Sequence, residues 1–278
     1  STDPAGLINL ASLNVQALNA GGAPTGGFFV TGNSDAIAIA GNLTVNVAGN
    51  IEYDFDGDGQ MTVGGNATLN SGQQILINHS NNLAPVNSID VAGTFAATAQ
   101  GNFVSTAGSR IGAGGTATVR SEQNATVADI AGVGLVDVSA LQNVLLVNGA
   151  VTGTPVVVNF GAGPVVTDPQ LIVRAGLDPT GTPAPTPTAS YDPNFNATIS
   201  GTVTSTGNIA VNAGGNAIFA TGSSTISDNG LTVQTGDDII IQTGASLTAA
   251  NNPATTPSAA TPFTDLNNLV LAAGALTP

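Results

Sequence analysis

The residues best suited to chemistry are the acidic side chains of one short motif, Asp54-Phe55-Asp56-Gly57-Asp58-Gly59-Gln60-Met61. Acidic residues at its first, third and fifth positions, glycine at the sixth and an apolar residue at the eighth match the front of a calcium-binding loop. Three carboxylates this close repel one another, and a divalent cation removes that penalty. The motif predicts one Ca²⁺ held by Asp54, Asp56 and Asp58, with the carbonyl of Gln60 as a further ligand.

The motif lacks two parts of a helical calcium hand. The bidentate glutamate expected at its twelfth position falls on Gly65, and no flanking helices are evident. Two interpretations therefore stay open. The motif is either a truncated loop at a corner of the fold, with the roughly 10⁻⁴–10⁻³ M affinity of extracellular modules, or a solvated acidic turn. The pair Asp237-Asp238 is a second acidic site, for which a metal or a plain polar corner are again the two alternatives.

Groups suited to catalysis are few. The single histidine, His79, follows an asparagine, and we expect it on the surface, without the partners of a serine triad. Asp129, Asp137 and Asp168 are scattered along the chain, and the arginines are not grouped. The chain has no cysteine, which removes thiolate metal sites and cysteine catalysis. We expect a protein that is not an enzyme.

The charge balance excludes two classes of partner. The chain has 17 acidic residues against three basic ones, giving a net charge of -14. Nucleic-acid binding needs a basic surface to neutralise phosphates, and an anionic membrane surface repels this chain in the same way. No apolar run approaches the roughly 18–20 residues of a membrane helix. We predict neither nucleic-acid binding nor membrane insertion, and a surface suited to an extracellular setting.

A short phrase of apolar and polar residues in alternation, opened and closed by glycine or asparagine, recurs along the chain. It reads GNLTVNVAGN from Gly41, GNATLNSG from Gly65 and GNIAVNAGGN from Gly207. Each copy predicts a short strand that cannot bury a face alone, so the copies must stack. Matched glycines such as Gly93 and Gly115 are 22 residues apart. The phrase predicts a parallel β-solenoid of about 22 residues per coil, with two or three strands in each.

The alternation also predicts which side chains form the core. Leu43, Val45 and Val47 share one face and should pack on equivalent residues of the next coil, while Thr44 and Asn46 face outward. Outward asparagine and threonine can stack into hydrogen-bonded ladders. Corner glycine and asparagine tolerate a left-handed backbone. An antiparallel β-sandwich alternates as well, but it gives no reason for one phrase to repeat.

The solenoid is predicted as one domain over residues 1–278, with two segments outside the pattern. Residues 176–195 alternate proline and threonine, which cannot form ladder hydrogen bonds, and we expect an excursion there. A second Pro-rich segment covers 251–262, in a C-terminal part that begins at 251. We expect a strand in SLNVQALNAGG from Ser12, and a strand or a cap in the final DLNNLVLAAGALTP.

Two long stretches carry a resemblance to a known family. TGNIAVNAGGNAIFATGSSTISDNGLTVQTGDDIIIQTGASLTAANN, from Thr206, resembles the shaft repeats of filamentous-haemagglutinin-like adhesins, which two-partner secretion exports from Gram-negative bacteria. GNLTVNVAGNIEYDFDGDGQMTVGGNATLNSGQQILIN, from Gly41, is similar to them too. The Asn-Pro-Asn signatures of that family's secretion domain do not occur. The resemblance implies a right-handed coil, a secreted protein on the bacterial cell surface, and a part in attachment, biofilm or filament building.

The leading functional expectation is a structural and adhesive protein, either a surface fibre or an adhesin shaft, with cell-surface or matrix polysaccharide as a partner. The first alternative is a carbohydrate-active β-helix enzyme, a glycosidase like those of phage tailspikes. The second is an ice-binding solenoid, since Thr202 and Thr204 form a Thr-x-Thr unit.

Two assembly states also stay open. Open end coils would make chains stack head to tail into filaments. A chain excised from a longer shaft would be monomeric. The first residue is Ser1 and not methionine, so we expect a processed or excised chain.

Overall fold

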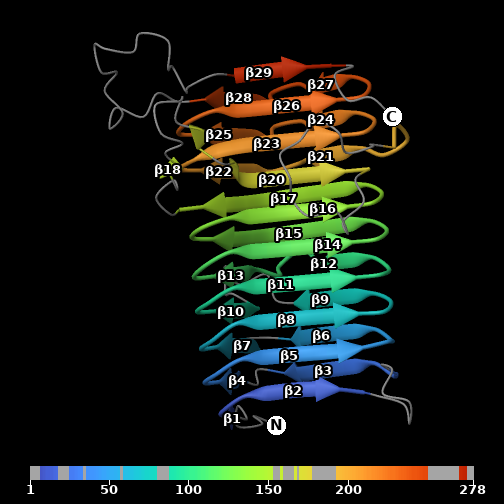
Figure 1. The fold of residues 1–278 in the computed structure, drawn as a ribbon, viewed down its shortest axis with the longest axis vertical. Coiled ribbons are helices and arrows are strands. Elements are labelled where there is room, and N and C mark those ends of the chain that lie inside the picture. Colours follow the sequence, from blue (N-terminus) through green and yellow to red (C-terminus); the bar gives the residue numbers. More distant parts are fainter. Residues whose placement is uncertain are drawn as a thin grey trace.

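Two parallel β-sheets, packed face to face, build the protein in the computed structural model of residues 1–278 (Figure 1). The structure describes residues 7–17, 25–33, 36–56, 59–79, 88–152, 157–158, 166–167, 169–176, 192–249 and 269–273. No helix occurs within these ranges. This all-β, parallel and repetitive arrangement is consistent with the predicted solenoid.

The sheet nearest the reader in Figure 1, here called the front sheet, takes one strand from each coil. Its ten strands are β2 (Leu13–Gln16), β5 (Leu43–Val47), β8 (Ala67–Ser71), β11 (Phe95–Ala99), β14 (Ala117–Ser121), β16 (Val136–Ala140), β20 (Pro169–Ala175), β23 (Asn208–Ala213), β26 (Leu231–Thr235) and β29 (Leu269–Ala272).

The sheet behind it consists of two columns side by side. The first column contains β3 (Phe28–Asn33), β6 (Ile51–Asp56), β9 (Ile75–His79), β12 (Phe103–Ser105), β21 (Ala197–Ile199), β24 (Ala217–Phe219) and β27 (Ile239–Ile241). The second column contains β1 (Leu7–Leu10), β4 (Ala36–Ile39), β7 (Gln60–Val63), β10 (Ile89–Val91), β13 (Ile111–Ala113), β22 (Thr202–Ser205), β25 (Ser224–Ser227) and β28 (Ser246–Ala249). The longer strands β15 (Ala125–Gly132) and β17 (Val144–Val151) run through both columns.

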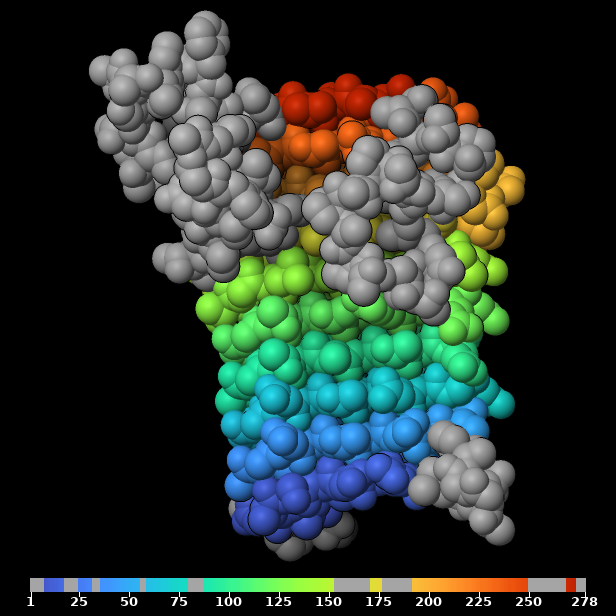
Figure 2. All heavy atoms as spheres, in the orientation of Figure 1, coloured from blue at the N-terminus to red at the C-terminus, as the bar shows by residue number. Residues whose placement is uncertain are grey.

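Each coil visits the front sheet, then the first column, then the second column, and the coils stack in sequence order (Figure 2). The step between neighbouring coils varies. Phe95 pairs with Ala117, 22 positions later, but Ala117 pairs with Val136, only 19 positions later. Leu231 pairs with Leu269, 38 positions later, because the Pro-rich segment lies between them. That segment is outside the described residues, as is most of an insertion that holds the antiparallel pair β18 (Val157–Val158) and β19 (Val166–Thr167).

The predicted alternation of core and surface is confirmed. In β5 the side chains of Leu43, Val45 and Val47 are buried, while Thr44 and Asn46 between them are partly exposed. The same alternation continues through β8 and β14. Parallel pairing in register places each inward side chain on its equivalent in the next coil, so the interior is a stack of thin apolar layers.

Corner glycines are required for a different reason than the predicted left-handed backbone. A Cβ at Gly64 would lie 2.3 Å from the carbonyl oxygen of Ala40 in the preceding coil, and one at Gly114 would lie 2.2 Å from that of Ala92. Neither glycine has a positive φ. Close approach of stacked corners therefore excludes a side chain there. A left-handed backbone does occur at Gly222 and Gly244, with φ of 74° and 75°.

The predicted excursion at 176–195 starts and ends at one place. The Gly176 amide donates to the carbonyl of Gln142 at 3.0 Å, which keeps Gly176 on the stack, and the Asp192 amide donates to the carbonyl of Gly176 at 3.0 Å. The residues between, 177–191, are outside the described part of the chain. The strands predicted near Ser12 and in the final stretch are confirmed as β2 and β29.

Candidate functional site

The predicted calcium motif lies where β6 ends and β7 begins. Asp54 faces outward from β6, between the buried side chains of Tyr53 and Phe55. Its carboxylate Oδ1 accepts a hydrogen bond of 2.7 Å from the side-chain amide Nδ2 of Asn78, one coil along. Asp56 is the last residue of β6 and Gln60 is the first of β7. Asp58 is outside the described residues.

The backbone of this motif is more extended than a calcium loop. Asp54 and Asp56 both belong to a strand, in which alternate residues are about 6.6 Å apart, whereas a calcium loop wraps the chain around the ion. The described residues contain no group of three acidic, histidine or cysteine side chains that could hold a metal. The described side chains of the motif thus include one carboxylate, that of Asp54, while residues 57–58 and the side chain of Asp56 are outside the described part of the chain.

A chain of polar side chains extends from Asp54 across the outer surface of neighbouring coils. Asn78 donates to Asp54 and accepts a hydrogen bond of 2.6 Å from the hydroxyl of Thr106. The Thr106 hydroxyl lies 3.4 Å from that of Ser109, whose own hydroxyl donates to the carbonyl of Ile77 at 2.9 Å. These contacts fix the orientation of the Asp54 carboxylate before any ligand arrives.

The expectation that His79 lies on the surface is wrong. His79 ends β9, pairs with Phe55 and is only 3% exposed. Its Nε2 lies 3.2 Å from the carbonyl oxygen of Gly59, so that nitrogen must carry the proton, and the buried Nδ1 has no hydrogen-bond partner. Ile75 and Ile77 of β9 face the core. Because every second residue of a strand faces the same side, the sequence could have placed His79 in the core as well.

Besides the strand contact between Asp54 and Asn78, side-chain ladders of asparagine run along the corners. At the corner before the first column, Asn124 Oδ1 accepts the backbone amide of Asn143 at 3.2 Å. Asn143 Oδ1 accepts that of Asn196 at 2.9 Å, and Asn196 Oδ1 that of Asn216 at 2.7 Å. Each asparagine side chain thereby accepts a hydrogen bond from a backbone N–H group at the corner that would otherwise lack a partner within the β-sheets.

A second ladder runs along the corner before the front strands, where Asn42 Oδ1 accepts the backbone amide of Asn66 and Asn66 Oδ1 accepts that of Thr94, both at 2.9 Å. This second ladder explains why asparagine follows glycine where the repeated phrase begins.

The acidic pair Asp237-Asp238 belongs to the same corner. The backbone amide of Asp238 donates to Asn216 Oδ1 at 3.0 Å, which continues the ladder, and both acidic residues are exposed. This contact supports the plain corner over the metal site.

An ion pair is buried on the outer side of the front sheet. Asp137 and Arg174 come from the neighbouring strands β16 and β20, and their charged atoms Oδ2 and NH2 lie 3.5 Å apart. Ser139 donates a hydrogen bond of 2.5 Å to the other carboxylate oxygen. Asp137 is only 2% exposed. Sequence reasoning treated Asp137 as a scattered acidic residue, because only the register of the strands brings it beside Arg174.

A second ion pair, Arg110–Asp129, lies at the bend between the two columns. Its atoms Nε and Oδ2 are 3.9 Å apart, and each side chain is about a third exposed. Burial raises the pKa of the Asp129 carboxyl, and the Arg110 guanidinium lowers it in part. The third scattered acid, Asp168, is outside the described residues. Both pairs join strands of neighbouring coils or the loops that lead into them.

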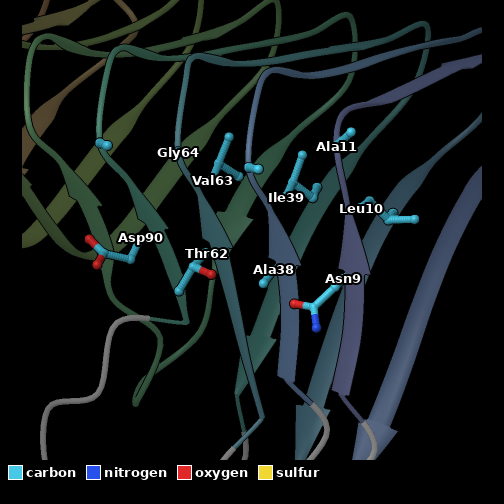
Figure 3. Close-up of a pocket in the computed structure, with 11 residues that line it drawn as sticks. Asn9, Leu10, Ala11, Ala38, Ile39, Thr62, Val63, Gly64 and Asp90 are labelled. Atoms are coloured by element: carbon cyan, nitrogen blue, oxygen red, sulfur yellow. The ribbon is translucent and has the colours of Figure 1, made fainter.

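A groove of about 580 Å³ crosses the second column near its N-terminal end (Figure 3). Asn9, Thr62 and Asp90 lie in one row across strands β1, β7 and β10, with Ala38 between them. The rest of the wall is apolar and includes Leu10, Ile39 and Val63. The groove has one carboxylate among uncharged groups, which suits binding better than acid–base chemistry.

The Thr-x-Thr unit of Thr202 and Thr204 is not repeated in the coils that follow it. Thr204 is in register with Ile226 and then Thr248, while Thr202 is in register with Ser224 and Ser246. An ice-binding face needs a regular array, which these two rows do not form.

Comparison of the chain with protein-family models, with characterised proteins and with solved structures gives no match. Within the described residues, no helix is long and apolar enough to cross a membrane. The account of function therefore depends on the geometry of the chain itself.

Proposed function

We propose that this protein is an extracellular structural and adhesive protein, a surface fibre or adhesin shaft that acts in attachment, biofilm or filament formation. The observation that carries the proposal is the unbroken stack of ten front strands with asparagine ladders at its corners. Such a stack is a long, stiff body whose outer side chains are mostly uncharged and polar. Its ion pairs and polar side-chain contacts join neighbouring coils.

We further propose a single right-handed solenoid domain over residues 1–278, with about 22 residues in coils that carry no insertion. The sense of the chain in Figure 1 supports the right hand, since front strands run to the right while the chain climbs toward its C-terminal end. Two steps of 22 positions, from Phe95 to Ala117 and from Ile209 to Leu231, support the coil length.

Surface display tests the adhesive role directly. The chain is fused to an outer-membrane anchor in a non-adherent Gram-negative host, and attachment to glass and cell–cell aggregation are measured. We expect both to rise above the anchor alone. A Phe95→Asp variant, which places a charge in the core and unfolds the stack, should lose the gain. Equal attachment by the anchor alone would overturn the proposal.

We also propose that copies of the chain stack head to tail. Leu269, Val270 and Leu271 of β29 are each 43–45% exposed, and among the described strands β29 pairs only with β26. A second copy that pairs its β2 with this edge would cover them. Electron microscopy over a range of concentrations tests the contact: rods should lengthen with concentration, and rods of one solenoid length at every concentration would exclude it.

Calcium binding by Asp54, Asp56, Asp58 and Gln60 stays part of the proposal, as a structural ion at the turn after β6. Millimolar Ca²⁺ should raise the melting temperature, and Asp56→Ala should abolish the rise. Mg²⁺ is the matched control, because its smaller octahedral shell suits a truncated loop poorly. An unchanged melting temperature across millimolar Ca²⁺ would show that the motif is a solvated acidic turn.

A further inference from the structure

The corner between the front sheet and the first column, on the right of Figure 1, carries an unusual concentration of side-chain amides. In the coils from β5 to β15 this corner contributes Asn50, Gln73, Gln74, Gln100, Asn102 and Gln123, here called the amide corner. The amides surround a hollow of about 260 Å³, and a second hollow of about 450 Å³ adjoins it and shares Gly72 and Gln100.

Glycines create the hollow. A Cβ at Gly72 would lie 2.5 Å from the carbonyl oxygen of Ala48, and one at Gly101 would lie 2.8 Å from that of Gln73. The stacked corners are therefore too close for side chains at these positions. Gln73 lies one coil before Gly101 and Gln123 one coil after it. These two glutamines are two coils apart, which is about 10 Å. Gly101 lies between them and has no side chain to fill the space.

The amides divide into an inner set that is already engaged and an outer set that is not. Asn50 Oδ1 accepts the backbone amide of Gln74 at 3.2 Å, and Asn102 Oδ1 accepts that of Asn124 at 3.1 Å. These contacts belong to a side-chain ladder at the corner and hold the inner amides of the hollow in place. The outer side chains of Gln73, Gln100 and Gln123 are exposed. A primary amide offers donors and an acceptor together, which matches a pair of adjacent sugar hydroxyls.

We propose that the amide corner binds a neutral polysaccharide, with Gln73, Gln100 and Gln123 as the contacting residues. This names a ligand class for the proposed adhesive role and rests on it. Gln73 and Gln123 are equivalent residues about 10 Å apart along the axis, and Gln100 belongs to the coil between them, so an extended ligand is needed to contact all three. No arginine lines either hollow, and Glu122 lines the second, so an acidic polysaccharide is repelled.

Affinity electrophoresis of the full chain tests the site. The acidic protein is run through native gels containing dextran, galactomannan or xyloglucan, with polygalacturonate as the acidic comparison. We expect at least one neutral polysaccharide to retard the protein and polygalacturonate to leave it unaffected. The variant Gln73→Ala/Gln100→Ala/Gln123→Ala should lower the apparent association constant at least tenfold, with its melting temperature unchanged.

The matched control removes two exposed amides from a strand far from the amide corner. Asn14→Ala/Gln16→Ala in β2 should leave the retardation as it is in the parent protein. The site would be overturned if no neutral polysaccharide retards the protein or if polygalacturonate alone does. It would also be overturned if the triple variant is retarded as strongly as the parent protein. Cells that display the triple variant on their surface distinguish a failure of the polysaccharide site from a failure of the proposed adhesive function. If the site fails but displayed cells still attach to glass, the proposed function stands without it.

Discussion

Leu69 and Leu271 occupy equivalent positions in two different coils. Leu69, in β8, lies between Val45 and Ala97 of the coils on either side and is fully buried. Leu271, in β29, pairs with Val233 on one side only and is 45% exposed. The same side chain on the same face of the same sheet thus has different surroundings. In a stack, burial depends on how many neighbouring coils a residue has, more than on the residue itself.

The largest effect that this comparison predicts is a difference between matched truncations. Leu69→Ala should destabilise the protein by about 2–5 kcal/mol, because it leaves a cavity between two coils. Leu271→Ala should cost less than about half as much, since solvent already reaches the side chain. Urea unfolding of both variants, followed by circular dichroism, measures the difference. Equal losses would mean that the end coil is as well supported as the central ones.

The buried ion pair extends the comparison to charged groups. In the front sheet, Asp137 is in register with Thr118 of the preceding coil and with Ile172 of the following coil. Asp137→Asn should lower the free energy of unfolding by about 2 kcal/mol, because it leaves the mostly buried Arg174 guanidinium without its counter-charge and makes the acceptor for Ser139 neutral.

The control for this prediction is Asp237→Asn, at the exposed corner, which should have no measurable effect. If both variants behave alike in urea unfolding, burial between two coils does not set the strength of this pair.

The corner ladder should contribute less per residue. Asn124 donates to Asn102 Oδ1 and Gln142 Oε1 at 3.2 and 3.0 Å and accepts the backbone amide of Asn143. Asn124→Ala should therefore cost about 1 kcal/mol and speed the hydrogen exchange of the Asn143 amide. Asn14→Ala, on the exposed face of β2, should change neither. An unchanged Asn143 exchange rate would show that the ladder adds nothing to its corner.

The repeated phrase predicted the stack but not the differences within it. Leu43, Val45 and Val47 could be placed in the core, because strand alternation is local and needs no knowledge of neighbours. The buried pair of Asp137 with Arg174 could not, because the chain between them is long and only the strand register joins them. The step of 19 positions between β14 and β16 was also hidden, since a shorter corner leaves the strand phrase intact.

The candidate site was predicted less well than the fold. The motif predicted a loop, but Asp54 lies within strand β6, and its hydrogen bond to Asn78 comes from another coil and has no signal in the local spacing. The amide corner likewise consists of glutamines and asparagines from several coils. Each is an ordinary polar residue in sequence, and only stacking brings them together around one hollow.

The smallest predicted effect concerns pH. The pKa of Asp129 is raised by burial, so its folded carboxyl holds a proton more tightly than the unfolded one. Stability is therefore lost as the pH rises through the range just above the ordinary pKa of aspartate, about 4. Asp129→Asn removes that loss and should raise stability at pH 7 by less than about 0.5 kcal/mol, since the pair with Arg110 is partly exposed and screened. At pH 3 the variant and the parent should unfold alike.

Hydrogen exchange along the chain tests most directly the claim that neighbouring coils support each other. In a dilute sample of single rods, amides of the central strands β8, β11 and β14 should exchange slowest. Those of β27, β28 and β29 should exchange much faster, because one side of that end of the described stack has no neighbour. Protection of β27–β29 equal to that of the central strands would contradict the account.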